Sequence, residues 1–545
     1  MLSKLKTIRA ILSQYSLGDC LWRLRYNRRK ARGQFERDFP AFAWADKSLS
    51  DSFTTARPQD AFGSFLFAPG ELPAVEAAWR TNAIERADAL IERGEFEYFS
   101  APALRGTLGY PDVDWFVNPF TDQRDTNMAH WSRRGDFDPN RGDIKYLWEP
   151  SRFGWVYDLA RAYAVSGDAK YPEAFWTLLE SWMDANPPML GPAWQCGQET
   201  AIRTFAICFG LWAFRPHPAT TDERVERALG LLAFCGDRIA SNIDYARRQH
   251  SNHSTSEAAG LYLLSTLLPT LKRAKEFRAT AERELLYDAT HHIKPDGSYL
   301  QHSLNYLRLA MHDFLWVVAL AKANGQTLDP KLPAALRTSR DFLYQLQDET
   351  GRVVNYGAND GALLCPWSGC YYLDYRPMLG ALSFALDNTR LYPPGPWDEE
   401  AMWFFGNDFL AAPATANPPA RTSHQFSAGG YYTLRTSRAW AMLRCHTYRS
   451  RPAQADQLHL DLWVDGLNLL RDMGSFAYYD PPLKRNLKFS STAMHNTVEI
   501  DGQNQMIKGP RFYWIRLSKG HVERADETSL RASHDGYARL GVGHT

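Results

Sequence analysis

Hydrophobic residues recur at helical spacing through most of this chain, from about residue 70 to residue 412. The pattern predicts helices over residues 74–94, 150–166, 171–186, 197–214, 222–247, 254–269, 274–293, 302–324, 332–347 and 376–388. Turns that contain proline and glycine, such as Asn186-Pro187-Pro188, separate them. Helices of similar length joined by short turns indicate an array or a toroid of antiparallel helix pairs.

The pattern changes after about residue 413, where Pro413, Pro418 and Pro419 mark a linker. Strand-like runs follow at 430–434, 440–444, 458–464 and 497–500, with the hairpin signals Asp465-Gly466 and Asp501-Gly502. This part is typical of antiparallel β structure. It stops at Thr545 in mid-pattern, so we expect it to be truncated or fragmentary.

These changes divide the chain into three parts, since 545 residues exceed one typical core. Residues 1–60 are predicted to form a helical or irregular extension, and residues 61–412 the helical domain. Residues 413–545 are predicted to form an antiparallel β domain that is incomplete at its C-terminal end. The expected fold class is therefore α+β, with several domains.

Composition excludes some partners. The chain carries 62 basic and 61 acidic residues, a net charge of +1, so no strong global field attracts nucleic acid or an anionic membrane. The basic run from Arg23 to Lys30 is most simply a solvated helix face. Aromatic residues make up 13% of the chain, which suits either a sugar-binding cleft or the core of a large helical protein.

Neither export nor membrane insertion is indicated. No run approaches the ~20 apolar residues that span a bilayer. Residues 1–12 lack the form of a signal peptide, so the literal expectation is a cytoplasmic protein, or a periplasmic one if the start is misassigned. The seven scattered cysteines are expected to be free thiols. The sequence does not indicate an oligomeric state.

Polar residues gather in three clusters far apart in the sequence. They are residues 249–254, residues 296–306, and a C-terminal set of Gln454, Asp456, His459, Asp472 and His495-Asn496. Asn, His and Tyr from distant segments are typical of a site that moves protons.

With these clusters in place, the chain resembles the heparinase II/III-like polysaccharide lyases. The matching motifs are Asp143 to Glu149, Cys196 to Arg203, Asn252-His253 with Glu257 to Leu261, Asp296-Gly297-Ser298 with Gln301-His302-Ser303 and Tyr306, Ala455 to Asp461, and His495 to Val498. The resemblance implies an incomplete (α/α) toroid followed by an antiparallel β-sandwich. It also implies β-elimination on a uronate-containing polysaccharide.

In that reaction a base removes the C5 proton beside the carboxylate, and a donor protonates the leaving oxygen. The resemblance makes Tyr306 the proton-transferring residue, with Asn252 and His253 on the substrate carboxylate and His302 in support. On the residues alone, Tyr306 could be an amphipathic core residue, and Asn252 could be the N-cap of the following helix.

Four further residues are assigned to substrate binding: Gln198, Glu199, Arg203 and His459. Glu199 and Arg203 are also spaced at i and i+4 on a helix, where an internal ion pair is the simpler interpretation.

The β domain departs from the family pattern. The family has a His-x-His-Ala-Asp segment, whose first His is catalytic and whose second helps bind a structural zinc. Here Pro452 and Gln454 occupy those positions. Of the zinc set, Asp472 and His495 remain, whereas Gln454 is a poor ligand. His459 is displaced by five residues along a strand-like run, so the sequence does not make it a substitute, whereas His446, just upstream, could reach the cleft instead.

Three functions follow from these observations. The first is a lyase acting on an acidic polysaccharide, such as a capsule or exopolysaccharide, because the neutral charge does not favour a densely sulfated chain. The second is a catalytically silent carbohydrate-binding or polysaccharide-assembly protein, which the lost histidines favour. The third is a glycoside hydrolase, which needs a pair of carboxylates that Glu199, Glu257 and Asp296 do not convincingly supply.

Overall fold

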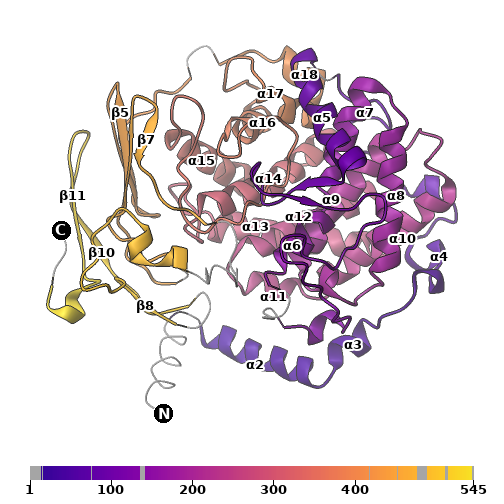
Figure 1. Cartoon of the computed structure of the whole chain (residues 1–545), viewed down its shortest axis with the longest axis horizontal. Coiled ribbons are helices and arrows are strands. Elements are labelled where there is room, and N and C mark those ends of the chain that lie inside the picture. The colour runs from indigo at the N-terminus through magenta and orange to yellow at the C-terminus, as the bar shows by residue number, and fades with distance from the viewer. Residues whose placement is uncertain are drawn as a thin grey trace.

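The computed structural model describes residue 14 and residues 16–74, 76–135, 142–415, 418–450, 452–475, 488–509 and 513–542. A large helical unit occupies one side of the molecule, and strands occupy the other (Figure 1). The change falls between the last helix, which ends at Ala411, and the strand that begins at His424. Residues 1–13 of the predicted extension lie outside the described residues.

The helices follow one another with short connections. They are α2 (Leu17–Ala31), α3 (Gln34–Asp38), α4 (Leu49–Ser52), α5 (Ala77–Arg93), α6 (Lys145–Ser151), α7 (Trp155–Ser166), α8 (Lys170–Ala185), α9 (Gly197–Phe214), α10 (Asp222–Ala240), α11 (Ile243–Arg247), α12 (Asn252–Leu267), α13 (Ala274–His291), α14 (Leu304–Ala323), α15 (Lys331–Gln345), α16 (Arg376–Asp387), α17 (Asp398–Phe405) and α18 (Asn407–Ala411).

Every helix predicted between residues 74 and 388 is present, but two of them are broken. The stretch 150–166 is divided by Phe153, whose φ of +62° no helix accommodates, so α6 ends before α7 begins. The stretch 222–247 is divided at Asn242, whose φ is −139°. Helices α17 and α18, which are short, were not predicted.

Alternate helices form one continuous row. Helix α7 packs against α9, α9 against α12, α12 against α14, and α14 against α16. The helices between them lie outside this row, with α8 on α7, α10 on α9 and α13 on α12. This packing order is the one expected for an incomplete (α/α) toroid. Large aromatic side chains fill the row, including the fully buried Trp316, Trp367 and Trp403.

The C-terminal part contains a five-stranded antiparallel sheet in the order β3-β4-β5-β6-β7. Its strands are β3 (His424–Phe426), β4 (Tyr431–Arg435), β5 (Ala439–Arg444), β6 (Leu460–Val464) and β7 (Leu467–Leu470). Two antiparallel pairs follow, β8 (Ile507–Lys508) with β9 (Trp514–Arg516) and β10 (Gly520–Ala525) with β11 (Leu530–His534). A further pair, β1 (Glu95–Glu97) and β2 (Arg105–Thr107), lies in the helical part.

The predicted hairpin at Asp465-Gly466 is confirmed. Both residues have positive φ, +47° and +78°, and they join β6 to β7. The hairpin predicted at Asp501-Gly502 was wrong in part. Asp501 and Gly502 do form a turn. Residues 497–500, however, form no strand and contribute a single bridge, from Ile500 to Gln503.

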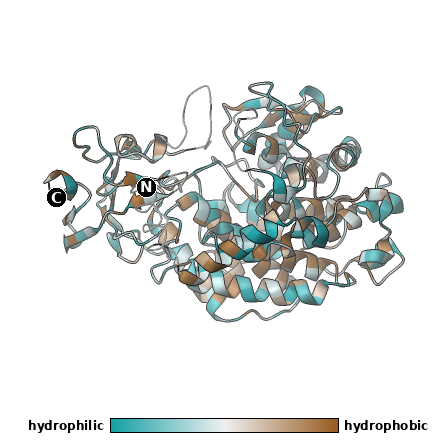
Figure 2. Ribbon diagram, turned by 90° about the horizontal axis from the view of Figure 1, so that it is seen from below, coloured by the Kyte–Doolittle hydropathy of each residue, from teal (hydrophilic) through white to brown (hydrophobic). Residues whose placement is uncertain are grey.

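Hydropathy follows this architecture. Apolar residues concentrate in the middle of the helical unit, whereas the strand-rich part is more mixed (Figure 2). Among the described residues, no helix has both the length and the apolar character needed to cross a bilayer.

Candidate active site and candidate metal centre

Three helices of the inner row begin at the same place. Helices α9, α12 and α14 start at Gly197, Asn252 and Leu304. Nε2 of Gln198 donates to Oγ of Ser256 at 3.0 Å, which joins the starts of α9 and α12. The backbone amide of Asn252 donates to Oε1 of Gln301 at 2.7 Å, which joins α12 to the segment before α14. Helix N-termini carry partial positive charge, so this end of the row favours an anion.

Tyr306 lies in the first turn of α14. Ser303 is the N-cap of that helix, and its Oγ accepts a hydrogen bond from the Tyr306 amide at 3.0 Å. Gly357 allows a neighbouring segment to pass close behind: it has a φ of +89°, and a Cβ there would lie 2.4 Å from the carbonyl oxygen of His302. The Tyr306 side chain is half-buried and packs against the core, so the core interpretation and the catalytic one are both compatible with its position.

Asn252 is the first residue of α12 and is 2% exposed. The N-cap is Ser251, so the interpretation of Asn252 as the cap is wrong. The reason is that the chain turns one residue earlier, after His250, whose φ is +50°. His253 is half-buried, and its Nδ1 lies 3.7 Å from Sγ of Cys196 at the start of α9. Helix capping therefore does not account for the burial of Asn252.

A cluster of three rings joins the strand-rich part to the region where α12 and α14 begin. His302 precedes α14, and its ring centroid lies 4.8 Å from that of His446, just beyond β5. Tyr448 lies 5.2 Å from each of them. Among the described residues, Nδ1 of His302 is buried without a hydrogen-bond partner. His302 and His446 are 144 positions apart in the sequence, yet the fold places their imidazoles in contact.

Cations surround these imidazoles. Burial, reinforced by Lys294, lowers the pKa of His302 well below its usual range. Burial together with Lys294 and Arg444 lowers the pKa of His446 to about 3, so both rings are neutral at pH 7. Burial also lowers the pKa of Lys294 to about 8. Neutral imidazoles beside buried cations suit a site that receives a negatively charged ligand.

Asp456 holds the two parts of the molecule together behind the rings. It is fully buried; Tyr448 donates to its Oδ1 at 2.9 Å, and Tyr356 from the helical part donates to its Oδ2. Arg444 lies over the ring of Tyr356, 4.8 Å from its centroid. Sequence analysis included Asp456 but missed Tyr356. The available signal was the run of Asn and Gly residues from 355 to 361, which is typical of a turn that supports a site.

The residues predicted at the start of α9 have structural partners. Glu199 accepts two hydrogen bonds from Arg152, at 2.6 and 2.8 Å. Arg203 is fully buried, and it donates to the carbonyls of Ser151 and Ala193. Their predicted mutual ion pair is thus replaced by contacts to α6 and its surroundings. Arg203 lies in the core, stacked 4.3 Å from the Trp182 ring, because burying a guanidinium requires such partners; a substrate-binding role for it is wrong.

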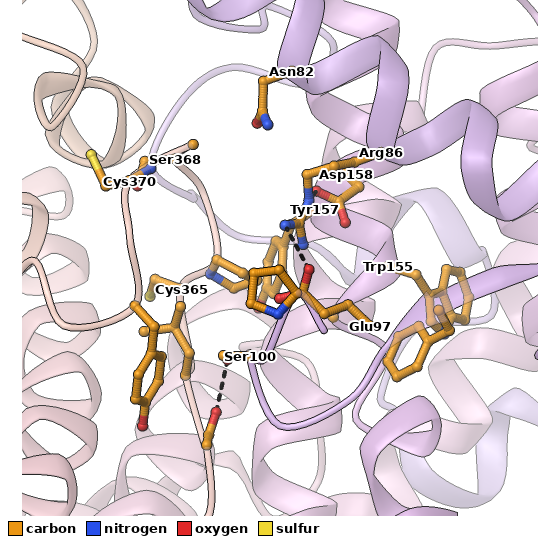
Figure 3. A pocket seen from close by; sticks show the side chains of 18 of the residues that line it. Asn82, Arg86, Glu97, Ser100, Trp155, Tyr157, Asp158, Cys365, Ser368 and Cys370 are labelled. Atoms are coloured by element: carbon orange, nitrogen blue, oxygen red, sulfur yellow. Dashed lines mark hydrogen bonds and ion pairs between the residues drawn. The ribbon is translucent and has the colours of Figure 1, made fainter. Parts of the chain in front are cut away.

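A separate cavity of about 940 Å³ lies along α5, α7 and the segment before α16 (Figure 3). In its lining, Arg86 pairs with Asp158 at 2.9 Å, and Ser100 donates to the carbonyl of Gly361 at 2.8 Å. Its lining holds more carboxylates than cations, which disfavours an acidic polymer. Arg308 in its wall donates to Oδ1 of Asn305, so the cavity borders the first turn of α14.

A second cluster of titratable groups lies within the β part. Ligand atoms of His459, Asp472 and His495 all lie within 4.8 Å of one another, and all three residues are buried. Nδ1 of His495 is 2.8 Å from Oδ2 of Asp472, and Nε2 of His459 is 3.6 Å from the same oxygen. The prediction that His459 binds substrate is therefore wrong: it is 0% exposed and belongs to this cluster.

These three residues are a suitable set for zinc, which favours His and carboxylate ligands. Nε2 of His495 is buried without a hydrogen-bond partner among the described residues, so it is available to a cation. Burial opposes ionisation of Asp472, but the charges of His495 and His459 outweigh it and lower the pKa of Asp472. Against this, Nδ1 of His459 accepts from the Asn496 amide at 3.1 Å, which also permits a metal-free, hydrogen-bonded cluster.

Gln454 occupies the second lost histidine position, and it does not restore the candidate metal site by itself. It is 3% exposed, and its Oε1 has no hydrogen-bond partner among the described residues. His459 would supply the second imidazole instead. Its position on the approach to β6 places it beside Asp472, because β6 and β7 are joined by a tight hairpin.

Comparison with known proteins agrees with this architecture. Residues 82–345 match the family described as heparinase II/III N-terminus, and residues 418–545 match heparinase II/III-like, C-terminal. A heparin-sulfate lyase of Bacteroides thetaiotaomicron is 25% identical over 422 residues, which cover 72% of this chain and 58% of that protein. One of Pedobacter heparinus is 22% identical over 388 residues, covering 68% and 54%.

The chain thus spans little more than half the length of these two relatives. Among solved structures, the crystal structure of heparinase III shares the fold, with a TM-score of 0.57 and 19% identity over 86% of this chain and 68% of the other. The two matched regions follow one another in the order of the helical and strand-rich parts. This chain belongs to the heparinase II/III-like family.

Proposed function

We propose that this protein is a polysaccharide lyase that cleaves an acidic, uronate-containing polysaccharide by β-elimination. The observation that carries the proposal is the contact of His302 with His446 from the strand-rich part, beside the starts of α12 and α14, which carry Asn252 and Tyr306. Both relatives reported above are named heparin-sulfate lyases, so a heparan-type chain is one candidate substrate.

In this proposal the first task is to neutralise the substrate carboxylate, because the C5 proton is otherwise too weakly acidic to be removed. Asn252 donates to the carboxylate at the joint start of three helices, where the helix dipoles add positive potential. His253 lies beside it. Lys294 contributes a nearby cation whose pKa, lowered by burial to about 8, keeps it charged at neutral pH.

The second task is to move two protons. Tyr306 is the proton-transferring residue, and it gives its phenolic proton to the leaving glycosidic oxygen. His446 takes the C5 proton in place of the histidine that Pro452 has replaced. The low pKa of His446 arises first from burial and then from Lys294 and Arg444. An arriving carboxylate offsets these cations and raises the pKa of the imidazole, which makes it a better base only when substrate is bound.

A metal ion is a separate part of the proposal. His459, Asp472 and His495 would hold a zinc ion that links β6, the segment after β7 and the segment before β8. Such an ion would stabilise the strand-rich part; it has no role in proton transfer here.

The deciding experiment is an assay of several acidic polysaccharides, sulfated and unsulfated, by three readouts. A lyase produces an unsaturated uronate that absorbs in the near ultraviolet. A hydrolase produces new reducing ends without that absorbance, and a binding protein produces neither. Absorbance that rises with the protein and not with Asn252→Ala supports the proposal, and new reducing ends without absorbance contradict it.

One observation favours a second function, that of a catalytically silent glycan-binding protein. Both histidine positions of the family motif are replaced, by Pro452 and Gln454. If His446 does not substitute, the site still offers Asn252 and Lys294 to an acidic sugar. Binding of acidic chains with no product of either kind, across the whole panel, would establish this alternative.

A further inference from the structure

Charge is distributed unevenly along this nearly neutral chain. Between residues 16 and 32 there are six basic residues and one acidic residue, although the whole chain has a net charge of only +1. This stretch is α2, an amphipathic helix at the outer edge of the helical unit, beside α11 (Figure 1). The catalytic proposal uses none of its residues.

One face of α2 is fixed to the body of the protein. Trp22 stacks on Tyr26 with ring centroids 5.1 Å apart, and Tyr26 stacks on Tyr245 of α11 at 4.9 Å. Asp19 pairs with Arg248, and the side chain of Ser16 caps the helix through the Asp19 amide at 3.0 Å. The helix is therefore held in place by its aromatic side, and it is not a loose tail.

The opposite face points to solvent and is apolar. Leu17, Leu21 and Leu24 follow one another at i, i+4 and i+7, which places them on one side of the helix. They are 74%, 57% and 59% exposed. Arg28 continues the same line, and Arg25 lies next to it; both are exposed. Three exposed leucines in a row are costly in water, and no described segment covers them.

We propose that this face of α2 docks on an anionic lipid surface. Leucines on the outer face would enter the boundary between headgroups and acyl chains, while Arg25 and Arg28 would contact the phosphates. An acidic polysaccharide would also attract the arginines, but it would have no use for the leucine row. The combination of exposed leucines with an excess of cations therefore favours lipid over glycan.

Such docking would also place the candidate active site near the membrane surface. Helix α2 packs on Tyr245 of α11, and the chain runs directly from α11 through His250 to Asn252. A polysaccharide that emerges from, or is anchored in, a membrane would then meet the site close to its point of attachment. This consequence depends on the proposed lyase function, whereas the docking itself does not.

The test is co-sedimentation of the full chain with vesicles of phosphatidylcholine alone and of phosphatidylcholine with 30% phosphatidylglycerol. Binding is expected to the anionic vesicles and to weaken strongly at high salt, because the headgroup attraction is screened. The triple variant Leu17→Ser, Leu21→Ser, Leu24→Ser should lose roughly tenfold or more in binding. Arg25→Ala with Arg28→Ala should show a loss of similar size.

A matched control is Leu467→Ser with Leu469→Ser, since these leucines of β7 are comparably exposed at 66% and 58% but lie outside α2. It should bind vesicles like the unaltered protein, and circular dichroism should show all variants folded. Three results overturn the proposal: no preference for anionic vesicles, unchanged binding by the leucine variant, or a leucine row that is covered by a second copy of the chain, seen as a dimer by light scattering that the triple variant abolishes.

The salt-dependent retention of the same variants on an acidic polysaccharide column separates the two kinds of polyanion. If α2 docks on lipid, the column retains the leucine variant like the unaltered protein, while vesicle binding by this variant is lost. If the leucine variant loses neither, and the arginine variant alone loses retention, α2 is a glycan contact and the lipid proposal fails.

Discussion

Two histidine clusters in this molecule differ in the charges that lie beside their imidazoles. At the candidate active site, Lys294 and Arg444 accompany the burial that lowers the pKa of His302 and His446. In the β part, burial would lower the pKa of His495 as well, but the carboxylate of Asp472 reverses the shift and raises it. Burial still lowers the pKa of His459, although Asp472 opposes the shift there too.

The neighbouring charges, more than the imidazoles themselves, set what each cluster can hold. Neutral imidazoles ringed by cations can receive an anionic sugar and accept a proton from it. Imidazoles around a buried carboxylate can receive a cation. The same residue type is thus suited to two different chemistries in one chain, and the spacing of histidines in the sequence does not separate them.

Apart from the proton-transferring Tyr306, the largest expected effect is at Asn252. Replacing it with Ala removes the donor that neutralises the substrate carboxylate while charge develops, so kcat/KM should fall by roughly 10²–10³-fold. Steady-state kinetics on the best substrate would measure this. The matched control is Ser251→Ala, because the side chain of this neighbouring N-cap residue makes no capping hydrogen bond; its kcat/KM should stay near that of the unaltered protein.

Next in size is the effect at His446, the proposed base. His446→Gln keeps a polar side chain but cannot accept the C5 proton, so kcat should fall by roughly 10²-fold with KM little changed. A variant with normal kcat would show that Tyr306 moves both protons, and the comparison of the two clusters would then rest on anion binding alone.

The candidate metal site makes a prediction about stability. If His459, Asp472 and His495 hold zinc, His459→Ala should reduce the metal content measured by mass spectrometry from about one ion per chain to near none. The melting temperature should fall by roughly 5 °C or more. His521→Ala, an exposed histidine on β10, serves as control. Metal-free protein with unchanged melting after chelation would support the hydrogen-bonded cluster.

A smaller effect should appear in the pH dependence of KM. Burial lowers the pKa of Lys294 to about 8, so the lysine is charged below pH 8 and loses its proton above it. Its attraction for an anionic substrate is therefore present at pH 7 and lost by pH 9, and KM should rise several-fold across that window. In Lys294→Met this rise should disappear, with KM high throughout; the same rise in the variant would assign it to another group.

The smallest effect concerns the helix that carries Tyr306. Ser303→Ala removes the side chain that caps α14, which should lower the free energy of unfolding by about 1–2 kcal/mol. Urea denaturation measures this change. Ser254→Ala would be a poor control because its Oγ donates to the buried Asp288. Ser437→Ala, at an exposed serine between β4 and β5, is better suited.

Local signals predicted much of the fold. The 3.6-residue period found the helices between residues 74 and 388, and Asp465-Gly466 found the hairpin, because both depend on neighbouring residues. The break at Phe153 lies between Pro150 and Gly154, both of which the predicted helix 150–166 included. The break at Asn242 was missed because residues 237–247 contain neither proline nor glycine.

The candidate site was predictable only in part, because some of its contacts join residues that lie far apart in the sequence. Asn252, His302 and Tyr306 could be proposed because they lie in recognisable motifs. The contact of His446 with His302 and the place of His459 beside Asp472 arise from strand pairing and from the packing of the two parts. Arg203 was misassigned because a sequence does not distinguish an arginine stacked among buried tryptophans from one that faces a cleft.

The most direct test of the central claim is a single absorbance assay for unsaturated uronates with three samples: the unaltered protein, the chelated protein and Tyr306→Phe. The account predicts product from the first two and none above background from the third, since Tyr306 moves a proton and the metal does not. Equal absorbance from Tyr306→Phe, or loss of absorbance on chelation in a protein that remains folded, would contradict it.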